Sequence, residues 1–304
     1  VAREWFHKQS SIWSEVHQKN VLSKLENDVF PWLGRETIAE ISAPRLLQVI
    51  RKIEDRGAIE TAHRTLSICG QILRYGIATG RAERDIASDL KGALKPVKRE
   101  HLAAIIEPAR FGELLREIYD YSGTVAVRCA LRLAPLVFLR PGELRTARWS
   151  DIDLHEATWS FVVQKTKTPL IIPLASQAVN ILQELTPVSG RYEYVFPNGR
   201  SPLRPMSENA VLAALRRLGI PKEEMCGHGF RASARTLLDE QLGFRPEVIE
   251  HQLAHKVKDP LGRAYNRTEF LEDRREMMQR WADYIDELRS TTNSLASRLM
   301  STHK

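Results

Sequence analysis

A stretch near the C-terminal end of the chain, from His228 to Tyr265, carries side chains that suit chemistry on phosphate esters. It opens with a His-x-x-Arg pattern that ends at Arg231, and Tyr265 follows ten residues after His255, the last residue of a Leu-Ala-His motif. An arginine is a planar, permanently charged fork that binds phosphate oxygens, and a tyrosine hydroxyl can form a covalent phosphoryl bond that divides one difficult step into two. These residues predict phosphoryl transfer through a protein nucleophile.

A second arginine, Arg140, lies much earlier, in the run Phe-Leu-Arg-Pro-Gly-Glu-Leu-Arg. Pro141 suits the first position of a helix, and Glu143 falls in its first turn. Two arginines can stabilise the charge on the non-bridging oxygens of a pentavalent transition state. We expect Arg140 and Arg231 to do so, with Glu143 orienting an arginine or a histidine.

The leaving oxygen of a cleaved phosphodiester needs a proton. A lysine in a cationic pocket can have its pKa lowered far enough to supply it. Lys165 and Lys167 are both candidates, because the β-rich runs 157–163 and 169–173 flank them and predict a hairpin. His228 could accept the tyrosine proton or orient the phosphate, and His255 could donate a hydrogen bond to a non-bridging oxygen.

No cofactor or metal is expected. The sequence has no P-loop, no dinucleotide fingerprint and no carboxylate cluster that would clearly hold two divalent ions. Its cysteines, Cys69, Cys129 and Cys226, form no Cys-x-x-Cys pair and are expected to be reduced core residues. Cys226 lies two residues before His228, but two ligands alone make a poor zinc site.

The elements that must position these residues predict two domains. Residues 1–95 predict a helical domain, with runs at 13–29, after Ser42 and at 61–78 that stop at the Pro31–Gly34 break, at Gly57 and at Gly80. The basic run Lys-Gly-Ala-Leu-Lys-Pro-Val-Lys-Arg follows and lacks an apolar stripe. We therefore expect a linker at 96–107, a second domain at 108–289 and a tail at 290–304.

Within the second domain the apolar pattern predicts helices at 108–118, 125–138, 176–185, 207–218 and 270–288. The helix at 125–138 has almost no polar face and should be buried. A Pro- and Gly-rich loop, 194–205, is expected to be irregular and without chemistry.

Composition sets outer limits on function. The 304 residues are 43% hydrophobic and 27% charged, which is typical of a globular protein, and no apolar run approaches the length of a membrane span. The net charge of +7 suggests a polyanionic partner. No signal-peptide pattern is present in this sequence, which begins at Val1.

From about residue 107 to residue 284, the ordered motifs resemble the tyrosine recombinase (phage integrase) family. The Arg-Pro-Gly-Glu and Ala-Tyr-Asn-Arg motifs are most similar to those of integrases of satellite phages and genomic islands. The resemblance implies a mainly α fold with a small antiparallel sheet, as a helical core-binding domain and a mixed α/β catalytic domain. It assigns Tyr265 as the nucleophile and favours Lys165 over Lys167. The implied catalytic residues are Arg140, Lys165, His228, Arg231, His255 and Tyr265, with Glu143 beside them.

The function implied is site-specific recombination that integrates or excises a mobile genetic element, such as a viral genome, through a 3′-phosphotyrosyl intermediate. The partners implied are double-stranded DNA attachment sites and further copies of the chain, as a tetramer in the synaptic complex. The resemblance also allows accessory DNA-bending proteins and implies no membrane. It places the protein in the bacterial cytoplasm, at the nucleoid. The DNA-binding candidates are His63, Arg64, Arg74, Lys95, Lys98 and Arg99.

Alternatives remain open at this stage. A type IB topoisomerase would share the chemistry but relax one duplex as a monomer, and a DNA-binding regulator on the same fold would bind without cleaving. Other tyrosines lie nearby, at Tyr192, Tyr194 and Tyr284, and of these Tyr284 falls in a regular helix and suits packing. Integrases of this type usually carry a further N-terminal domain that binds arm-type sites, so the chain may be a fragment of a longer protein.

Overall fold

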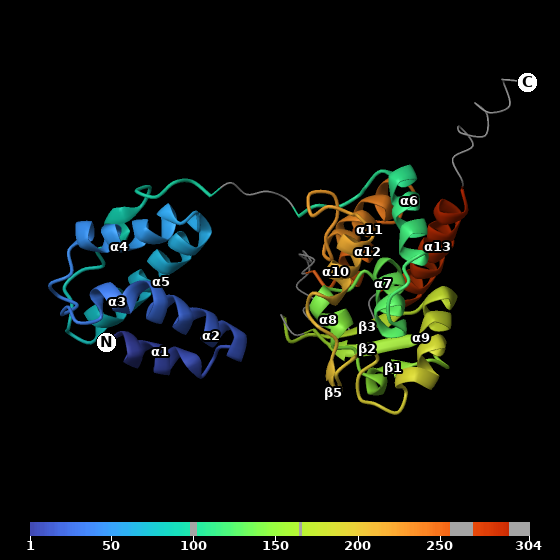
Figure 1. Ribbon diagram of the computed structural model, residues 1–304, viewed down its shortest axis with the longest axis horizontal. Coiled ribbons are helices and arrows are strands. Elements are labelled where there is room, and N and C mark those ends of the chain that lie inside the picture. The colour runs from blue at the N-terminus through green and yellow to red at the C-terminus, as the bar shows by residue number, and fades with distance from the viewer. Residues whose placement is uncertain (98–101, 164–165, 256–269, 292–304) are drawn as a thin grey trace, which may run out of the picture. The chain divides into compact units, whose positions relative to one another are not determined.

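The computed structural model describes residues 1–97, 102–163, 166–255 and 270–291. It divides the chain into two compact units, Val1–Glu100 and His101–Lys304, each with its own hydrophobic core (Figure 1). The fold is mainly α with two small antiparallel sheets, which confirms the predicted fold class. Among the helices that are described, none combines the length and apolar character needed to cross a membrane.

The first unit is a helical bundle. Its elements are α1 (Ala2–Ser10), α2 (Glu15–Lys24), a π-helical turn (Leu25–Val29), α3 (Phe30–Leu33), α4 (Ala43–Asp55) and α5 (Ile59–Ala78). The helical backbone continues through Pro31 and ends at Leu33, with Gly34 as the C-cap, which lies within the predicted Pro31–Gly34 break. Pro31 lies in the first turn of α3, directly after the π-helical turn. The helix predicted after Ser42 is confirmed as α4, and Ser42 caps it by accepting a hydrogen bond from the backbone N–H of Arg45.

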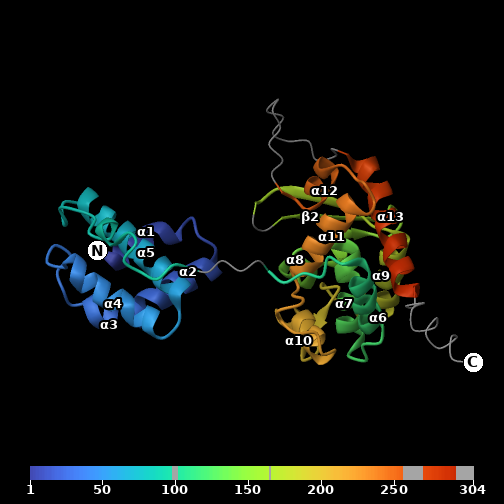
Figure 2. The same cartoon turned by 90° about the horizontal axis from the view of Figure 1, so that it is seen from above.

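The second unit is built around α7 (Val125–Val137), whose residues from Cys129 to Val137 are almost all buried, as the sequence predicted. Around it pack α6 (Pro108–Tyr119), α8 (Pro141–Arg145), α9 (Ser176–Ser189), α10 (Ala210–Arg217), α11 (Gly229–Glu240) and α13 (Leu271–Ser290), while α12 (Pro246–Gln252) lies against α11 and α13 (Figures 1 and 2). Segments from both halves of the unit therefore converge on one buried helix.

A three-stranded antiparallel sheet lies beside these helices, in the order β1 (Ile152–Asp153), β2 (Thr158–Val162) and β3 (Pro169–Pro173). Thr158 pairs with Pro173 and Val162 pairs with Pro169, so the predicted hairpin is confirmed. The loop predicted to be irregular is a second, two-stranded sheet, β4 (Pro197–Asn198) and β5 (Ser201–Pro205). The sequence analysis missed this sheet because its strands contain prolines. Proline normally argues against a strand and is tolerated only at edges and bulges.

The cysteines of the two cores are unreactive. Cys69 and Cys129 are buried, and Cys226 is half-buried. Burial raises the pKa of Cys69 to about 12 and that of Cys129 to about 11, so both stay as thiols at neutral pH. The expected core role is confirmed for these two residues.

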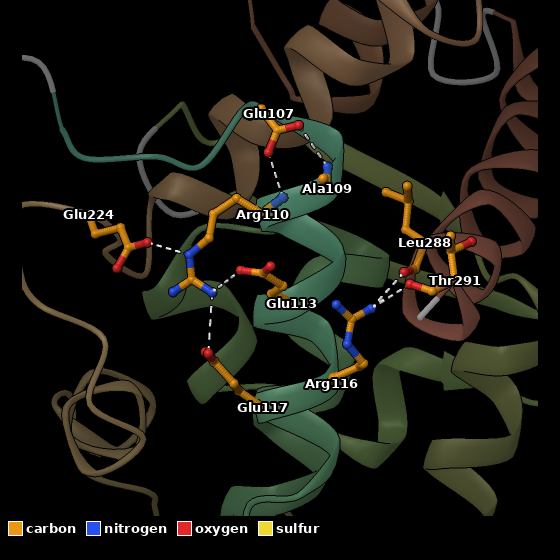
Figure 3. A network of polar contacts seen from close by, with 9 residues as sticks. All are labelled: Glu107, Ala109, Arg110, Glu113, Arg116, Glu117, Glu224, Leu288 and Thr291. Atoms are coloured by element: carbon orange, nitrogen blue, oxygen red, sulfur yellow. Dashed lines mark hydrogen bonds and ion pairs between the residues drawn. The ribbon is translucent and has the colours of Figure 1, made fainter. Parts of the chain in front are cut away.

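Two arginines of α6 hold the second unit together (Figure 3). Arg116 donates from Nη1 to the carbonyl oxygens of Leu288 (3.1 Å) and Thr291 (3.2 Å), which end α13. The last carbonyls of a helix have no partner within it, so this side chain acts as a cap. Arg110 donates from Nε to Glu224 at 2.6 Å and thereby ties α6 to the segment that precedes α11.

Close approach of α6 and α13 depends on Gly112. A Cβ atom added there would lie 2.5 Å from the carbonyl oxygen of Leu288, which is closer than packed atoms come. Alanine favours a helix by ~1 kcal/mol over glycine, but the clash is with backbone and forces α13 to move. We expect Gly112→Ala to lower the free energy of unfolding by about 1–3 kcal/mol in urea denaturation. Gly199→Ala, at a position with open space, is the control; equal stability of both variants would contradict the tight contact.

Candidate active site

The guanidinium of Arg231, in the first turn of α11, lies at the centre of the site. The residue is 9% exposed. Its Nη1 donates to the carbonyl oxygen of Phe138 at 2.9 Å, and its Nη2 donates to that of Leu253 at 2.7 Å. Phe138 ends α7 and Leu253 ends α12. One side chain therefore caps two helices that lie far apart in the sequence.

The chain leaves both helix ends through left-handed backbone. Phe138 has φ 35° and ψ 39°, and Ala254, which directly follows Leu253, has φ 51°. Neither is glycine, and an L-residue in this conformation costs roughly 1–2 kcal/mol. The turn ends each helix so that its last carbonyl is free to accept from Arg231.

Arg140 follows Phe138 by two residues and occupies the N-cap position of α8. Glu143, one helical turn later, is buried and accepts from Nη1 of Arg140 at 2.9 Å and from its backbone N–H at 3.1 Å. The carboxylate thus holds both the side chain and the main chain of Arg140. Of the alternatives in the sequence prediction, an arginine or a histidine, the structure shows Glu143 on the arginine.

Two cations share this small region. Burial, and after it the charge of Arg140, lower the pKa of Arg231 to about 10, while Glu143 and Glu250 act in the opposite direction. Arg231 is therefore still charged at neutral pH. Arg231 is buried and Arg140 is half-buried, and their two guanidinium groups together favour the binding of an anion with paired oxygens, such as a phosphodiester.

His255 lies directly beside Arg231. Its Nε2 is 3.3 Å from Nη2 of Arg231, and its Nδ1 is 2.5 Å from Oε2 of Glu250. The other oxygen of Glu250 accepts from Nε of Arg235 at 2.7 Å. Burial would raise the pKa of Glu250, but the hydrogen bonds from His255 and Arg235 outweigh it and leave that pKa lowered. Glu250 is thus a carboxylate held between two donors.

His228 occupies the N-cap position of α11, one turn before Arg231, and its carbonyl oxygen accepts from the Arg231 backbone N–H at 3.1 Å. Its side chain is exposed. The structure therefore brings Arg140, Glu143, Arg231 and His255 together and places His228 at the start of the helix that carries Arg231.

Other predicted residues, Lys98, Arg99, Lys165 and Tyr265, lie outside the described residues. Lys167 is described; it is exposed at the hairpin, with φ 57°, and its N–H donates to the Val163 carbonyl at 2.8 Å. Among the residues that the structure describes, no group of three or more His, Cys, Asp or Glu is placed to hold a metal ion.

The basic candidates of the first unit make contacts within it. Arg64 pairs with Glu60, and Arg74 pairs with Asp85. Nε2 of His63 is 2.8 Å from the carbonyl oxygen of Lys95. A hollow of about 400 Å³ is lined by residues that include His63, Arg74 and Lys91. Their part in DNA binding stays a prediction.

Sequence reasoning missed three residues near the site. Glu250 and Arg235 sit on the facing helices α12 and α11, a pairing that spacing alone does not reveal. Arg274, on α13, is completely buried; burial lowers its pKa to about 10. It donates to the carbonyl of Ile171 on β3 and contacts Nδ1 of His251 at 3.0 Å. The only sign of its burial in the sequence was that Arg274 lies close to the apolar residues Met277, Met278 and Trp281.

Gln252, next to Leu253, is 1% exposed, and neither its Oε1 nor its Nε2 has a hydrogen-bond partner in the described part of the chain. A buried polar group without a partner costs about 1–3 kcal/mol. We expect Gln252→Met, which keeps the length of the side chain, to raise the free energy of unfolding by about that amount in denaturant titration. The exposed Gln241→Met is the matched control; a loss of stability in Gln252→Met would show that the amide is paired after all.

Comparisons with known proteins identify the family. The phage integrase family model matches residues 107–272, and a model of the phage integrase central domain matches residues 1–93. The integrase of Enterobacteria phage P4 is 37% identical over 311 residues, which cover 97% of this chain and 70% of the relative. Prophage integrase IntZ of Escherichia coli (strain K12) is 38% identical over 290 residues, 95% of this chain and 71% of the relative.

Solved structures share the fold. The crystal structure of a lambda integrase (75–356) dimer bound to a COC′ core site has a TM-score of 0.67 and 20% identity, and the match covers 84% of this chain and 95% of that chain. A lambda integrase tetramer bound to a Holliday junction also has a TM-score of 0.67, with 86% of this chain and 80% of that chain covered.

Proposed function

Since this chain belongs to the phage integrase family and is a tyrosine-type site-specific recombinase, we propose that Tyr265 cleaves DNA strands through a 3′-phosphotyrosyl bond. The observation that carries this proposal is the fixed position of Arg231. Its guanidinium is held by two helix ends, lies against His255 and is electrostatically coupled to Arg140. Such a cluster suits a phosphodiester that is attacked at phosphorus.

The proposed cleavage step is an in-line displacement. The hydroxyl oxygen of Tyr265 attacks phosphorus, the bond from phosphorus to the 5′ oxygen breaks, and Lys165 gives that oxygen its proton. His228 accepts the proton of the tyrosine or orients the phosphate. In the second step a free 5′ hydroxyl attacks the phosphotyrosine, which restores the diester and the tyrosine. The bond energy is kept in the covalent intermediate, so no nucleotide cofactor is required.

In this proposal Arg140, Arg231 and His255 act on the non-bridging oxygens. Negative charge on these oxygens must be met by donors that are already in place, because donors that reorganise during the reaction contribute less. Arg231 meets that condition through its two carbonyl contacts. Arg140 meets it through Glu143, which holds its main chain and its side chain at once.

The proposed partners are double-stranded DNA attachment sites and further copies of the chain. Two duplexes must each be cut on two strands, so we propose a tetramer in the synaptic complex, with accessory DNA-bending proteins and the bacterial nucleoid as the setting. The lambda integrase dimer on a core site and the tetramer on a Holliday junction support this proposal. The net charge of +7 supports binding to DNA, with His63, Arg64, Arg74 and Lys95 as contact candidates.

Tyr265→Phe should bind DNA with unchanged affinity but form no covalent adduct, because it removes only the nucleophilic hydroxyl. The measurement is a denaturing gel after incubation with a nicked suicide substrate drawn from the ends of the element, in the presence of a chelator. Tyr284→Phe is the control, since Tyr284 is half-buried against Trp281, with ring centroids 6.1 Å apart. An adduct peptide that maps to any tyrosine other than Tyr265 would overturn the assignment.

Lys165→Ala should slow cleavage by ~10²-fold or more, the usual loss for a general acid. A substrate with sulfur in place of the 5′ bridging oxygen should restore most of the rate, because a thiolate leaves without protonation. Lys167→Ala, at the neighbouring lysine, should show a smaller loss and no rescue. If only Lys167→Ala is rescued by the sulfur substrate, the acid is Lys167.

A further inference from the structure

Glu250 holds His255 by two separate contacts. Its side-chain Oε2 lies 2.5 Å from Nδ1 of the imidazole, and its backbone carbonyl accepts from the backbone N–H of His255 at 3.0 Å. The second contact depends on the left-handed turn at Ala254, which brings the chain back over the end of α12. Both the position and the orientation of the ring are therefore set by one residue.

The hydrogen-bond network fixes which nitrogen carries the proton. Nη2 of Arg231 has only hydrogens to offer, so Nε2 of His255, 3.3 Å away, can face it only as an acceptor. In the neutral ring the hydrogen must then lie on Nδ1, where it is donated to the carboxylate of Glu250. The tautomer is set by Arg231, which can only donate, and by the Glu250 carboxylate, which can only accept.

We propose that Glu250 is a positioning residue for His255, which it holds in the Nδ1–H tautomer with Nε2 directed at the phosphate-binding edge of Arg231. The inference deepens the proposed function and rests on it. To donate a hydrogen bond to a non-bridging phosphate oxygen, Nε2 must carry a hydrogen as well as Nδ1, so the ring that meets the phosphate is an imidazolium. The carboxylate on the opposite nitrogen offsets the charge that the ring then carries.

The distribution of charge around the ring supports this role. The positive charge of Arg140 is balanced by its ion pair with Glu143. Arg235 is shared between Asp239 (2.8 Å) and Glu250 (2.7 Å), so this group keeps one negative charge in excess. An imidazolium at His255, the form that can donate to phosphate, would balance that charge. The charge of Arg231 is then left to meet the single negative charge of a phosphodiester.

A purely structural role predicts a different pattern. If Glu250 served only to join α12 to α11 through Arg235, loss of its charge would lower stability and leave the chemistry intact. The two roles can be separated, because Arg235→Gln removes the contact between the helices and leaves the pair of Glu250 and His255 in place.

Glu250→Gln in the full chain should keep DNA affinity and lower the rate of adduct formation by roughly 10- to 100-fold, as for other carboxylates that support a functional histidine. The ¹⁵N shifts of the His255 ring should change from one tautomer to a mixture, because an amide can donate to Nδ1 as well as accept from it, and only the longer contact of 3.3 Å with Arg231 then favours the Nδ1–H form. Arg235→Gln should lower stability yet keep the tautomer and most of the rate. Glu247→Gln, at an exposed position on the same helix, should change neither the tautomer of His255 nor the rate of adduct formation.

A double-mutant cycle on the suicide substrate decides the point. If Glu250 acts through His255, Glu250→Gln should have no further effect on the rate in a His255→Ala background. An unchanged tautomer and rate in Glu250→Gln, or full additivity in the cycle, would overturn the inference. If Glu250→Gln does not fold, Glu250→Asp, whose carboxylate stops short of Nδ1, replaces it in the same cycle. Failure of the wild type to form any adduct would instead contradict the proposed function, while the ring shifts would still report on Glu250.

Discussion

The site depends on one buried charge, the guanidinium of Arg231, that two helix ends hold in place. Burial together with Arg140 lowers its pKa to about 10, and a lowering of this size opposes the charged form by roughly 3 kcal/mol. Hydrogen bonds from a charged donor contribute about 1.5–3 kcal/mol each, and the carbonyls of Phe138 and Leu253 accept two of them from this guanidinium. The negative ends of the two helix dipoles act in the same direction.

This constraint sets the positions of the neighbouring residues. Arg140 lies two residues beyond Phe138, and His255 lies two residues beyond Leu253. Each short connection begins at a helix end that Arg231 itself caps, so neither residue can shift far from the guanidinium without breaking a carbonyl contact. The left-handed conformations of Phe138 and Ala254 are the local cost of that arrangement. Backbone strain and a buried cation thus occur at the same place for the same reason.

The sequence predicted most of the helices, the hairpin of β2 and β3 and the types of residue at the site, because these depend on local periodicity and on known motifs. It could not predict the two left-handed helix ends, since neither Phe138 nor Ala254 is a residue that favours them. It also missed Glu250, which meets Arg235 only because α11 and α12 pack together. The second sheet was missed for a local reason, as its strands contain prolines. Periodicity and motifs in the sequence do not predict contacts between segments that are distant along the chain.

A second buried cation shows that the same solution is used twice. Arg274 is fully buried and, among the described residues, is held by the carbonyl of Ile171 and by His251 instead of a carboxylate. It joins β3 of the hairpin to α12, two elements that flank segments with predicted catalytic residues. A carboxylate partner would lower the free-energy cost of burying either arginine. Next to Arg231, however, a carboxylate would also compete with phosphate for the guanidinium. Carbonyl oxygens carry no net charge, so they fix a cation in place while leaving its charge available. In the proposed function the donors must be in place before the phosphate reacts, and that requirement favours helix ends over ion pairs as the support for the central arginine.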